Sequence, residues 1–310
     1  MIKKEEKNAK NSEKVIKIKE KGIKRKETLT KKEISKFVNI ALATSKIKKI
    51  TVEQKNGDWD LRTNINLFIY GEIGSTKSTL LNTISKLTNS KKPFTDLTFP
   101  ALIGSIDKMT RQLIIGSCWE CRNSLMLLDE FNFTKRNKDD IRALLQLIEG
   151  GEYNKKLASF SSPTKETDED LSYSFENGEF NIKTRFSLIV VTMKHPYFTQ
   201  NMELKALVSR SLCLPFFPEK KILSEIADGF PLFKFKEYKV EPKIIIKKID
   251  YKIIKKIVDD KTNGINYLRI IGDCVRVFAV LKEHNEDIYN LIIKLGSKKF
   301  TSARKNEDYK

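Results

Sequence analysis

The 310-residue chain lacks the features that would direct it into a membrane or an oxidising compartment. No apolar run approaches the ~18 residues needed to span a bilayer, and the lysine-rich start has no apolar core of a signal peptide. Four cysteines are too few for a disulfide framework in a chain of this length, which agrees with a reducing compartment. We therefore expect a cytoplasmic protein with no membrane segment.

Metal-binding residue types are also scarce. The chain has two histidines, His195 and His284, and a single C-x-x-C pair, Cys118 and Cys121. No second pair and no suitably spaced histidine completes the four ligands of a structural zinc site. We therefore expect these cysteines to pack in a core or an interface.

What the chain has in excess is positive charge. It carries 59 Lys and Arg against 40 Asp and Glu, a net charge of +19 at neutral pH. Such an excess favours polyanions, meaning nucleic acid or an anionic membrane, with strongly salt-dependent binding. An AT-rich genome raises Lys, Ile and Asn content without selecting for any ligand, so charge alone leaves both explanations open.

The stretch from Asn66 to Leu81, NLFIYGEIGSTKSTLL, has the layout of a phosphate-binding loop. An apolar strand precedes a glycine-containing turn, and Lys77 to Thr79 open a helix. In such a loop the backbone N–H groups surround the β-phosphate, the lysine reaches the β and γ oxygens, and the serine binds Mg²⁺. The usual spacing, G-x-x-x-x-G-K-[ST], has glycine before the lysine, where this chain has Thr76.

The layout of the loop predicts that its run of consecutive residues binds the nucleotide. Ser78, one of them, is also expected to bind Mg²⁺. The alternative is an ordinary strand-turn-helix with a surface lysine. The run is Gly71, Glu72, Ile73, Gly74, Ser75, Thr76, Lys77, Ser78 and Thr79.

A second apolar strand, Ser124 to Leu128, ends in Asp129 and Glu130. Both carboxylates therefore lie at the carboxyl end of the strand, where parallel sheets bind ligands. Asp129 is expected to hold Mg²⁺ and Glu130 to polarise the attacking water. An acidic pair in isolation fits a solvated loop equally well, but its place after the phosphate loop favours ATP and Mg²⁺ as cofactors.

Apolar strands that end in glycine-rich turns or acids alternate with helices along the chain. This order predicts a three-layer α/β nucleotide-binding domain at 29–218. A basic tail at 1–28 is expected before it, and a helical lid with a C-terminal tail at 219–310 after it.

Smaller elements are predicted around this core. Thr30 and Glu33 predict a capping box at the start of the first helix. Two polar-aromatic arms, 152–160 and 173–183, predict a long hairpin around a mobile acidic insert, SSPTKETDEDLS. Further elements are a turn at 56–58, a small hairpin near 108–115, a central strand FSLIVVT, a helix at 203–211, a strand LCLPFF, and lid helices at 253–258, 264–282 and 288–295.

The motifs GEIGSTKST, LLDEF, a strand ending in Thr192 and SRS at 209–211 occur in the order found in AAA+ ATPases. Among these ATPases the chain most resembles the MCM replicative helicase group, which also has a small residue other than glycine before the lysine. LIGSIDKMTRQLIIGS resembles that family's hairpin insert in the second helix, and GGEYNKK through FNIKTRFSL resembles its pre-sensor hairpin. The resemblance covers roughly residues 64–278. It implies a P-loop AAA+ ATPase domain with β-hairpin inserts and a C-terminal helical lid.

The resemblance also implies roles for residues outside the loop. Thr192 matches the polar sensor that orients water, where the family usually has Asn. Arg210 matches the arginine finger, which reaches the γ-phosphate of a neighbouring subunit; the alternative is an arginine that caps helix carbonyls. Arg269 matches the second sensor, and Arg276, seven residues further along the same helix, is the second candidate.

Lys155 and Lys156, on the first arm of the long hairpin, are the candidates for nucleic-acid contact, because the family's hairpin carries basic residues into a central channel. A merely solvated turn is the alternative for these two lysines.

Taken together, the resemblance implies an ATP-hydrolysing motor that acts on DNA as a helicase, translocase or remodeller. It implies a homo-oligomeric ring, most simply a hexamer, with ATPase sites shared between subunits. Because only a basic tail precedes the ATPase core, we expect a minimal or mobile-element helicase, or a loader that works with a replication or mobile-element protein partner. The alternatives are an ATP-dependent scaffold or switch with weak hydrolysis, which Thr76 and Thr192 favour, and a remodeller of host proteins that never touches nucleic acid.

Overall fold

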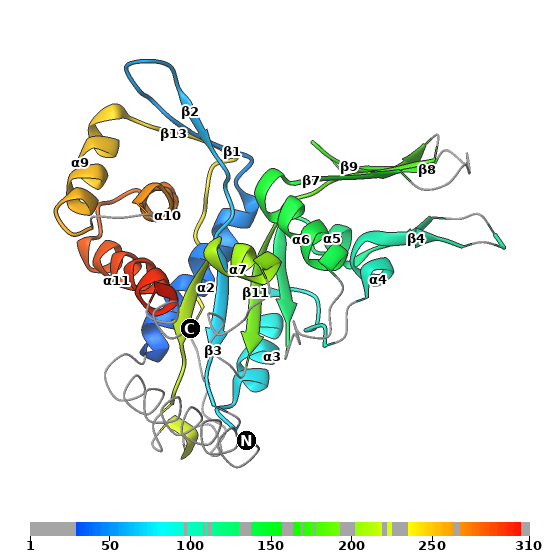
Figure 1. The fold of residues 1–310 in the computed structure, drawn as a ribbon, viewed down its shortest axis with the longest axis horizontal. Helices are drawn as coiled ribbons and strands as arrows, with labels where there is room; N and C mark the ends of the chain where they lie inside the picture. Colours follow the sequence, from blue (N-terminus) through cyan, green and yellow to red (C-terminus); the bar gives the residue numbers. More distant parts are fainter. Residues whose placement is uncertain are drawn as a thin grey trace, which may run out of the picture.

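The computed structural model shows a mixed α/β fold with a four-stranded parallel sheet, smaller antiparallel sheets beside it and a group of C-terminal helices (Figure 1). The predicted basic tail at 1–28 lies outside the described residues. Within the part of the chain that the structure describes, no helix has both the length and the apolar character needed to cross a membrane. The described residues are 29–72, 74–95, 98–107, 109–110, 113–129, 138–156, 164–168, 170–176, 178–192, 202–218, 222–224, 235–262 and 267–304.

The first helix, α2 (Lys31–Lys46), begins with the predicted capping box. The backbone N–H of Glu33 donates to Thr30 Oγ1 at 3.2 Å, and the N–H of Thr30 donates to a Glu33 carboxylate oxygen at 2.7 Å. Both pairs satisfy main-chain donors that a helix start leaves without a partner. Most of the helix is buried, and it contacts three strands of the parallel sheet.

The parallel sheet has the strand order β12-β3-β11-β6, and every predicted apolar strand is present in it. β11 lies inside the sheet between β3 and β6, as its continuous β-branched sequence predicted. Thr192 is in register with Tyr70, and Val190 with Leu128, so the carboxyl ends of the strands lie along one edge. The strands are β3 (Asn66–Tyr70), β6 (Ser124–Leu128), β11 (Phe186–Thr192) and β12 (Ser211–Pro215).

Helices cover both faces of this sheet (Figure 1). Side chains alternate between the faces, so Leu67 and Ile69 enter one hydrophobic core while Phe68 and Tyr70 enter another. The first core also contains residues of α2, α3 and the C-terminal helices, and the second contains residues of α6 and α7. These helices are α3 (Lys77–Thr88), α6 (Lys138–Gly150) and α7 (Met202–Ser209).

The predicted small hairpin is present and projects from the body of the protein (Figure 1). Its turn begins at Asp107, whose Oδ1 accepts hydrogen bonds from the N–H groups of Met109 and Thr110 at 2.7 and 3.0 Å. The hairpin and its flanking helices are α4 (Phe99–Ile103), β4 (Gly104–Ile106), β5 (Leu113–Ile115) and α5 (Ser117–Glu120).

The two predicted arms do pair, because β7 of the first arm lies antiparallel to β10 of the second. The prediction of a mobile insert between them is wrong for residues 164–168, which form a strand, so the region is a four-stranded antiparallel sheet in the order β7-β10-β9-β8. The second arm is itself a hairpin that turns near Gly178, which has the positive φ of 78° that glycine adopts without strain. The acidic insert supplies β8, which pairs with β9 over five residues. The strands are β7 (Glu152–Lys156), β8 (Thr164–Asp168), β9 (Leu171–Glu176) and β10 (Glu179–Lys183).

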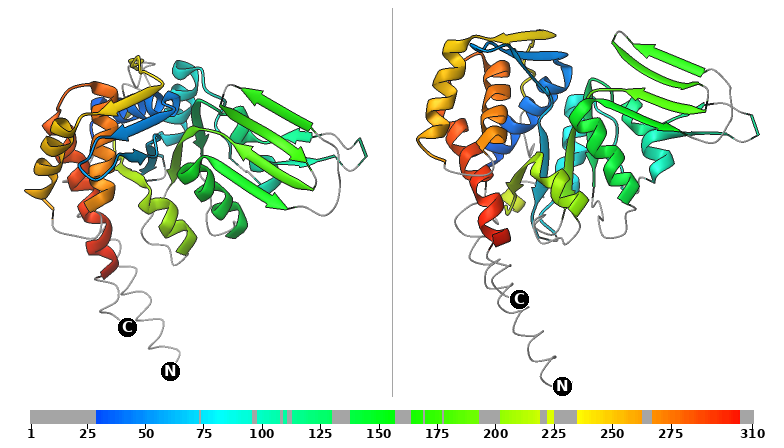
Figure 2. Two further views of the ribbon diagram at one scale, coloured as in Figure 1. Left: turned by 90° about the horizontal axis from the view of Figure 1, so that it is seen from above. Right: turned by 45° about the horizontal axis from the view of Figure 1, so that its top comes forward.

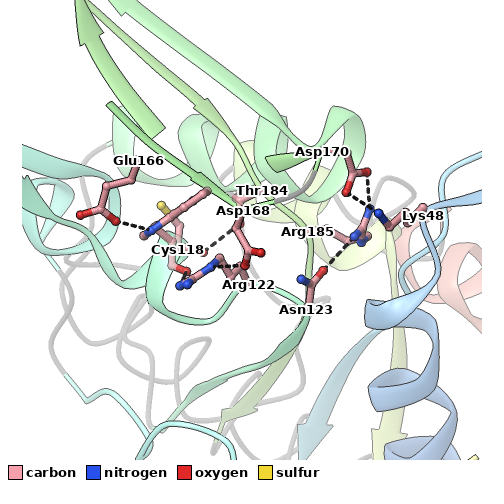
Figure 3. Close-up of polar contacts among 10 residues, drawn as sticks. Lys48, Cys118, Arg122, Asn123, Glu166, Asp168, Asp170, Thr184 and Arg185 are labelled. Atoms are coloured by element: carbon pink, nitrogen blue, oxygen red, sulfur yellow. Dashed lines mark hydrogen bonds and ion pairs between the residues drawn. The ribbon is translucent and has the colours of Figure 1, made fainter. Parts of the chain in front are cut away.

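Three acidic residues of the insert contact the body of the protein (Figure 3). Acids at three alternate positions each meet a donor from α5, from the turn after it, or from the ends of neighbouring elements. Glu166 and Asp168 are alternate residues of β8 and share one face, whereas Asp170 lies in the turn that follows the strand. The contacts are Trp119 Nε1 to Glu166 (2.9 Å), Arg122 Nε to Asp168 (2.8 Å), and Lys48 Nζ and Arg185 Nη1 to Asp170 (3.1 and 3.2 Å).

Tyr173 of β9 anchors the antiparallel sheet to the small hairpin. Its buried hydroxyl donates to the carbonyl of Ile103 at 2.7 Å and accepts from the N–H of Gly116 at 3.2 Å. Its ring lies 5.8 Å from that of Trp119, centroid to centroid. The two projecting elements therefore share one packed base.

A third sheet joins the start and the end of the described chain (Figure 2). The predicted turn at 56–58 connects β1 to β2. A strand that was not predicted from the sequence, β13, pairs in parallel with β1. The predicted lid helices are present and share one hydrophobic core with α2. These elements are β1 (Lys49–Val52), β2 (Trp59–Leu61), β13 (Lys243–Ile246), α9 (Lys248–Asp259), α10 (Tyr267–Leu281) and α11 (Glu286–Arg304).

Candidate functional site

The turn between β3 and α3 lies at the carboxyl edge of the parallel sheet. Its first residue, Gly71, is held by two neighbouring strands: its N–H donates to the carbonyl of Thr192 at 3.3 Å, and a Cβ built on it lies 2.1 Å from the carbonyl oxygen of Phe216. Only glycine fits so close to another main chain. Gly74 has φ of 79°, a second position that favours glycine.

Lys77 is buried and folds its side chain back over the turn. Its Nζ donates to the carbonyl of Gly71 at 3.1 Å, to the hydroxyl of Ser75 at 2.8 Å and to the carbonyl of Glu72. The ammonium group therefore lies inside the concave side of the loop, surrounded by oxygen atoms. This is the position from which a lysine reaches phosphate oxygens in a phosphate-binding loop.

Thr76, the residue that departs from the usual spacing, adopts a left-handed conformation with φ of 60° and ψ of 24°. Glycine adopts this conformation without strain, whereas a side chain at this position costs about 1–2 kcal/mol. The Thr76 hydroxyl donates to the carbonyl of Ser75 at 2.7 Å. The backbone thus takes the shape that glycine favours, although threonine is present.

The other predicted residues of the run surround Lys77. Ser78 and Thr79 are exposed in the first turn of α3, where the helix N-terminus supplies positive potential. Ser75 is buried, and its hydroxyl donates to the carbonyl of Glu72 at 2.7 Å. Ile73 lies outside the described residues.

Asp129 follows β6 at the same edge of the sheet, and its side chain is buried. Its N–H donates to the carbonyl of Phe94 at 2.9 Å, which fixes the main chain. Within the described ranges, its Oδ1 is buried with no hydrogen-bond partner. A buried carboxylate oxygen without a partner costs free energy unless a cation or a donor reaches it, so this atom fits a metal ion. Glu130, predicted to polarise the attacking water, lies outside the described residues.

Thr192 ends β11, the strand between β3 and β6. Its carbonyl accepts the N–H of Gly71, so β11 and the loop are in direct contact. The structure therefore brings the loop, Thr192 and Asp129 to one edge of one sheet. β6 is two strands from β3, so at about 4.8 Å per strand Asp129 lies about 10 Å across the sheet from the loop.

This chemistry fits ATP with Mg²⁺. The concave turn with its ammonium group suits phosphate oxygens, and the serine hydroxyl and buried carboxylate are oxygen ligands of the kind that Mg²⁺ prefers.

Comparison of the chain with protein-family models finds no match, and a search of curated proteins finds no relative. The function therefore has to be argued from the residues and their placement.

Arg210 lies at the opposite end of the parallel strands, where they begin. It directly precedes β12, whose first residue, Ser211, is in register with the first residue of β3, Asn66. Its Nη1 donates to the carbonyl of Ala206 at 2.8 Å, and its Nε pairs with the carboxylate of Glu149. Arg210 thus caps a carbonyl of α7, which is the alternative to its predicted role as an arginine finger.

Arg269 lies near Arg210. Burial lowers the pKa of the Arg210 guanidinium, and the charges of Arg269 and Arg62 lower it further. Arg269 is exposed on α10, whereas Arg276 is buried and pairs with Asp273 at 2.6 Å. Of the two candidates for the second sensor, only Arg269 therefore has a side chain that solvent reaches.

Lys155 and Lys156 lie on β7, an edge strand of the antiparallel sheet. Lys155 is half-buried on the face that carries the buried Tyr153, and Lys156 is exposed on the other face. Because neighbouring residues of a strand point to opposite faces, a nucleic-acid strand on one face meets only one of these lysines.

Cys118 and Cys121 are buried and not oxidised to a disulfide, as expected for packing residues. Burial raises the pKa of both thiols, that of Cys121 to about 12. No cluster of metal-ligating side chains occurs among the residues with described positions.

Two residues near Arg210 were not predicted from the sequence. Arg62 donates from Nη2 to the carbonyl of Arg210 at 3.1 Å, and Glu149 pairs with the Arg210 side chain. Both also line a cavity of about 310 Å³ between α6, the end of β2 and the base of the antiparallel sheet. Neither residue belongs to a motif, and 148 positions separate Arg62 from Arg210, so no local pattern signals the contact.

Proposed function

We propose that the chain is an ATP-hydrolysing, ring-forming motor of the AAA+ type, similar to the MCM group, that acts on DNA as a helicase, translocase or remodeller. One observation carries the proposal: the buried ammonium of Lys77, inside a phosphate-type loop, shares the carboxyl edge of the sheet with Asp129, whose buried Oδ1 has no hydrogen-bond partner among the described residues. The ammonium of Lys77 suits phosphate oxygens, and the carboxylate of Asp129 suits a divalent metal ion that accompanies the phosphates. Both lie at the carboxyl ends of parallel strands, where such sheets bind ligands.

Each group of the site has a task in this proposal. Lys77 exchanges its present oxygen partners for phosphate oxygens, and the N–H groups at the start of α3 donate to the same phosphates. Ser78 would hold Mg²⁺, as would Asp129, directly or through water, and the ion would supply charge neutralisation on the phosphate oxygens. Thr192 orients the water molecule, and Glu130 removes its proton.

The position of Arg210 supports a shared site. β3 has five residues at about 3.3 Å each, so Arg210 lies about 16 Å from the loop of its own subunit along the strand direction. Arg210 can therefore stabilise transferring phosphate only in a neighbouring copy. This favours a homo-oligomer, and we propose a hexameric ring.

DNA is the proposed substrate because of the net charge of +19 and the two projecting β elements. Lys155 and Lys156 are the proposed contacts, one on each face of β7. A cytoplasmic location beside the nucleoid, with a replication or mobile-element protein as partner, fits such a motor.

A second candidate function, an ATP-dependent switch with weak hydrolysis, is favoured by the contacts of Arg210. Its Nε pairs with Glu149 and its Nη1 with the carbonyl of Ala206 in the same subunit, so the guanidinium has to leave these partners before it reaches a phosphate. Tight ATP binding with negligible turnover supports the switch, and brisk DNA-stimulated turnover excludes it.

The test is ATP hydrolysis by the wild type and by Lys77→Ala, with and without single- and double-stranded DNA. We expect Lys77→Ala to lower turnover at least ~100-fold, the size of effect found when one preorganised charge-stabilising group is removed. Lys86→Ala is the matched control, since Lys86 is an exposed lysine on the same helix. The proposal fails if the wild type does not hydrolyse ATP or if the Lys77 variant hydrolyses it normally.

A further inference from the structure

The edge of the parallel sheet opposite the phosphate loop carries a group of arginines with few carboxylates. Three of them, Arg62, Arg210 and Arg269, lie close together: besides burial, the charge of Arg269 lowers the pKa of Arg62, and the charges of Arg269 and Arg62 lower the pKa of Arg210. The carboxylates that the described residues place with them are Glu149 and Asp273. Such an excess of partly desolvated positive charge is costly unless an anion approaches it.

Arg62 has a distinct place in this group because it lies between two other arginines. It follows β2, and its Nη2 donates to the main-chain carbonyl of Arg210 at 3.1 Å. The carbonyl of Arg62 in turn accepts a hydrogen bond from Nε of Arg276 at 2.8 Å. A continuous chain of hydrogen bonds thus runs from α10 through Arg62 to the residue that precedes β12.

Arg276 is the fixed end of this chain. Its side chain is 4% exposed, its Nη1 pairs with Asp273 at 2.6 Å, and burial lowers its pKa to about 10. A guanidinium so enclosed has no access to a ligand. Its contribution is to hold the main chain of Arg62, and burial likewise lowers the pKa of the Arg62 side chain itself.

We propose that Arg62 is a positioning residue for Arg210: by holding the Arg210 carbonyl, it sets the direction in which the guanidinium leaves the main chain toward a neighbouring subunit. This inference rests on the proposed function, in which Arg210 stabilises phosphate in the next copy. A shift of about 1 Å at such a group costs on the order of 10²-fold in rate. Arg62→Ala is therefore expected to lower kcat 10- to 100-fold and to leave KM for ATP unchanged, because the phosphate loop is not altered.

The decisive experiment separates the two subunits that form one site. Lys77→Ala subunits supply an intact Arg210 but no phosphate loop, and Arg210→Ala subunits supply the reverse. Each is expected to be inactive alone and partly active when mixed. We then expect Arg62→Ala to abolish this rescue when it is combined with Lys77→Ala, and to leave the rescue intact when it is combined with Arg210→Ala.

Matched controls exclude a merely structural effect. Arg142→Ala, which removes an exposed arginine that pairs with Glu203, should leave the rescue unchanged in the Lys77→Ala subunit. Arg62→Lys keeps the charge and one donor and should restore part of the activity. Thermal denaturation and oligomer size are measured for each variant.

Three outcomes overturn the proposal, and they can be told apart. Loss of rescue when Arg62→Ala is combined with Arg210→Ala, as well as when it is combined with Lys77→Ala, shows a general role in folding or assembly. Rescue that survives in both combinations shows that Arg62 does not act on Arg210. Absence of rescue in the parent mixture, or activity of Arg210→Ala alone, refutes the shared site itself and the role of Arg62 with it.

Discussion

The left-handed conformation of Thr76 leads to a prediction in which the usual ranking of two residues is reversed. In the interior of a helix, alanine is more stabilising than glycine by about 1 kcal/mol. At position 76, with φ of 60° and ψ of 24°, we expect glycine to be the more stabilising of the two. Thr76→Gly and Thr76→Ala both remove the hydroxyl that donates to Ser75, so comparing them isolates the backbone effect.

The expected magnitude follows from two opposing contributions. A side chain in the left-handed region costs about 1–2 kcal/mol, which glycine avoids. Glycine loses more backbone entropy on folding, which offsets about 0.5–1 kcal/mol of that gain. We therefore expect the free energy of unfolding of Thr76→Gly to be about 0.5–1 kcal/mol higher than that of Thr76→Ala. Each kcal/mol corresponds to about 2–4 °C in Tm.

The measurement is urea denaturation of both variants in the absence of nucleotide. The matched control is the exposed Asn82 in the middle of the same helix, where Asn82→Ala should be more stable than Asn82→Gly. The reasoning is refuted if alanine equals or exceeds glycine at position 76, since the left-handed conformation would then not exist in solution.

Three further changes test the packing around the site, each by urea denaturation. Gly71→Ala places a Cβ 2.1 Å from the carbonyl oxygen that follows β12, and should lower the free energy of unfolding by about 1–3 kcal/mol. Tyr173→Phe removes the hydroxyl that joins the antiparallel sheet to the small hairpin, and should cost about 2 kcal/mol. The pKa of Asp170 is below its ordinary value, because burial, which raises it, is outweighed by hydrogen bonds from Arg185 and Lys48. A lowered folded-state pKa stabilises the protein above the unfolded pKa and is lost as the pH falls through the folded pKa. Asp170→Asn should therefore cost up to about 1 kcal/mol at pH 7, and the difference should close below about pH 4.

Each of these changes has a matched control. Gly150→Ala introduces a Cβ with no neighbour within 4 Å, and a Gly71 variant of equal stability would contradict the close approach at Gly71. Tyr238→Phe should have little effect, and an equal loss there would show that the Tyr173 hydroxyl is not special. Asp58→Asn, at an exposed turn, should cost less at pH 7 than Asp170→Asn.

Elements whose signals are local could be predicted from the sequence. The capping box of α2 depends on Thr30 and Glu33, three residues apart, and the strands of the parallel sheet are continuous apolar runs. The strand, turn and helix around Lys77 also have a local signal, because the apolar run, the glycine-containing turn and the helix start follow one another. The conformation of Thr76 within that loop was not predictable, since the side chain there disfavours it.

Elements that depend on distant partners could not be predicted. The insert that contains β8 is acidic and has the composition of a solvated loop, but β8 contacts Trp119 and Arg122, whose acid partners Glu166 and Asp168 lie 47 and 46 positions away. β13, a short run of three isoleucines after a lysine, becomes a strand because β1 offers an open edge. The contact of Arg62 with Arg210 could not be predicted either, because the two residues are 148 positions apart in the chain.

The pairing of β1 with β13 sets an order in which the protein can complete its fold. A two-stranded hairpin such as β1–β2 is marginally stable alone in water, and its third strand, β13, follows about 180 residues later. A ribosome that adds about 5–20 residues per second delivers that strand roughly 10–40 s after the hairpin. During synthesis the unpaired edge of β1 is therefore exposed for tens of seconds, and the last strand to emerge protects one of the first.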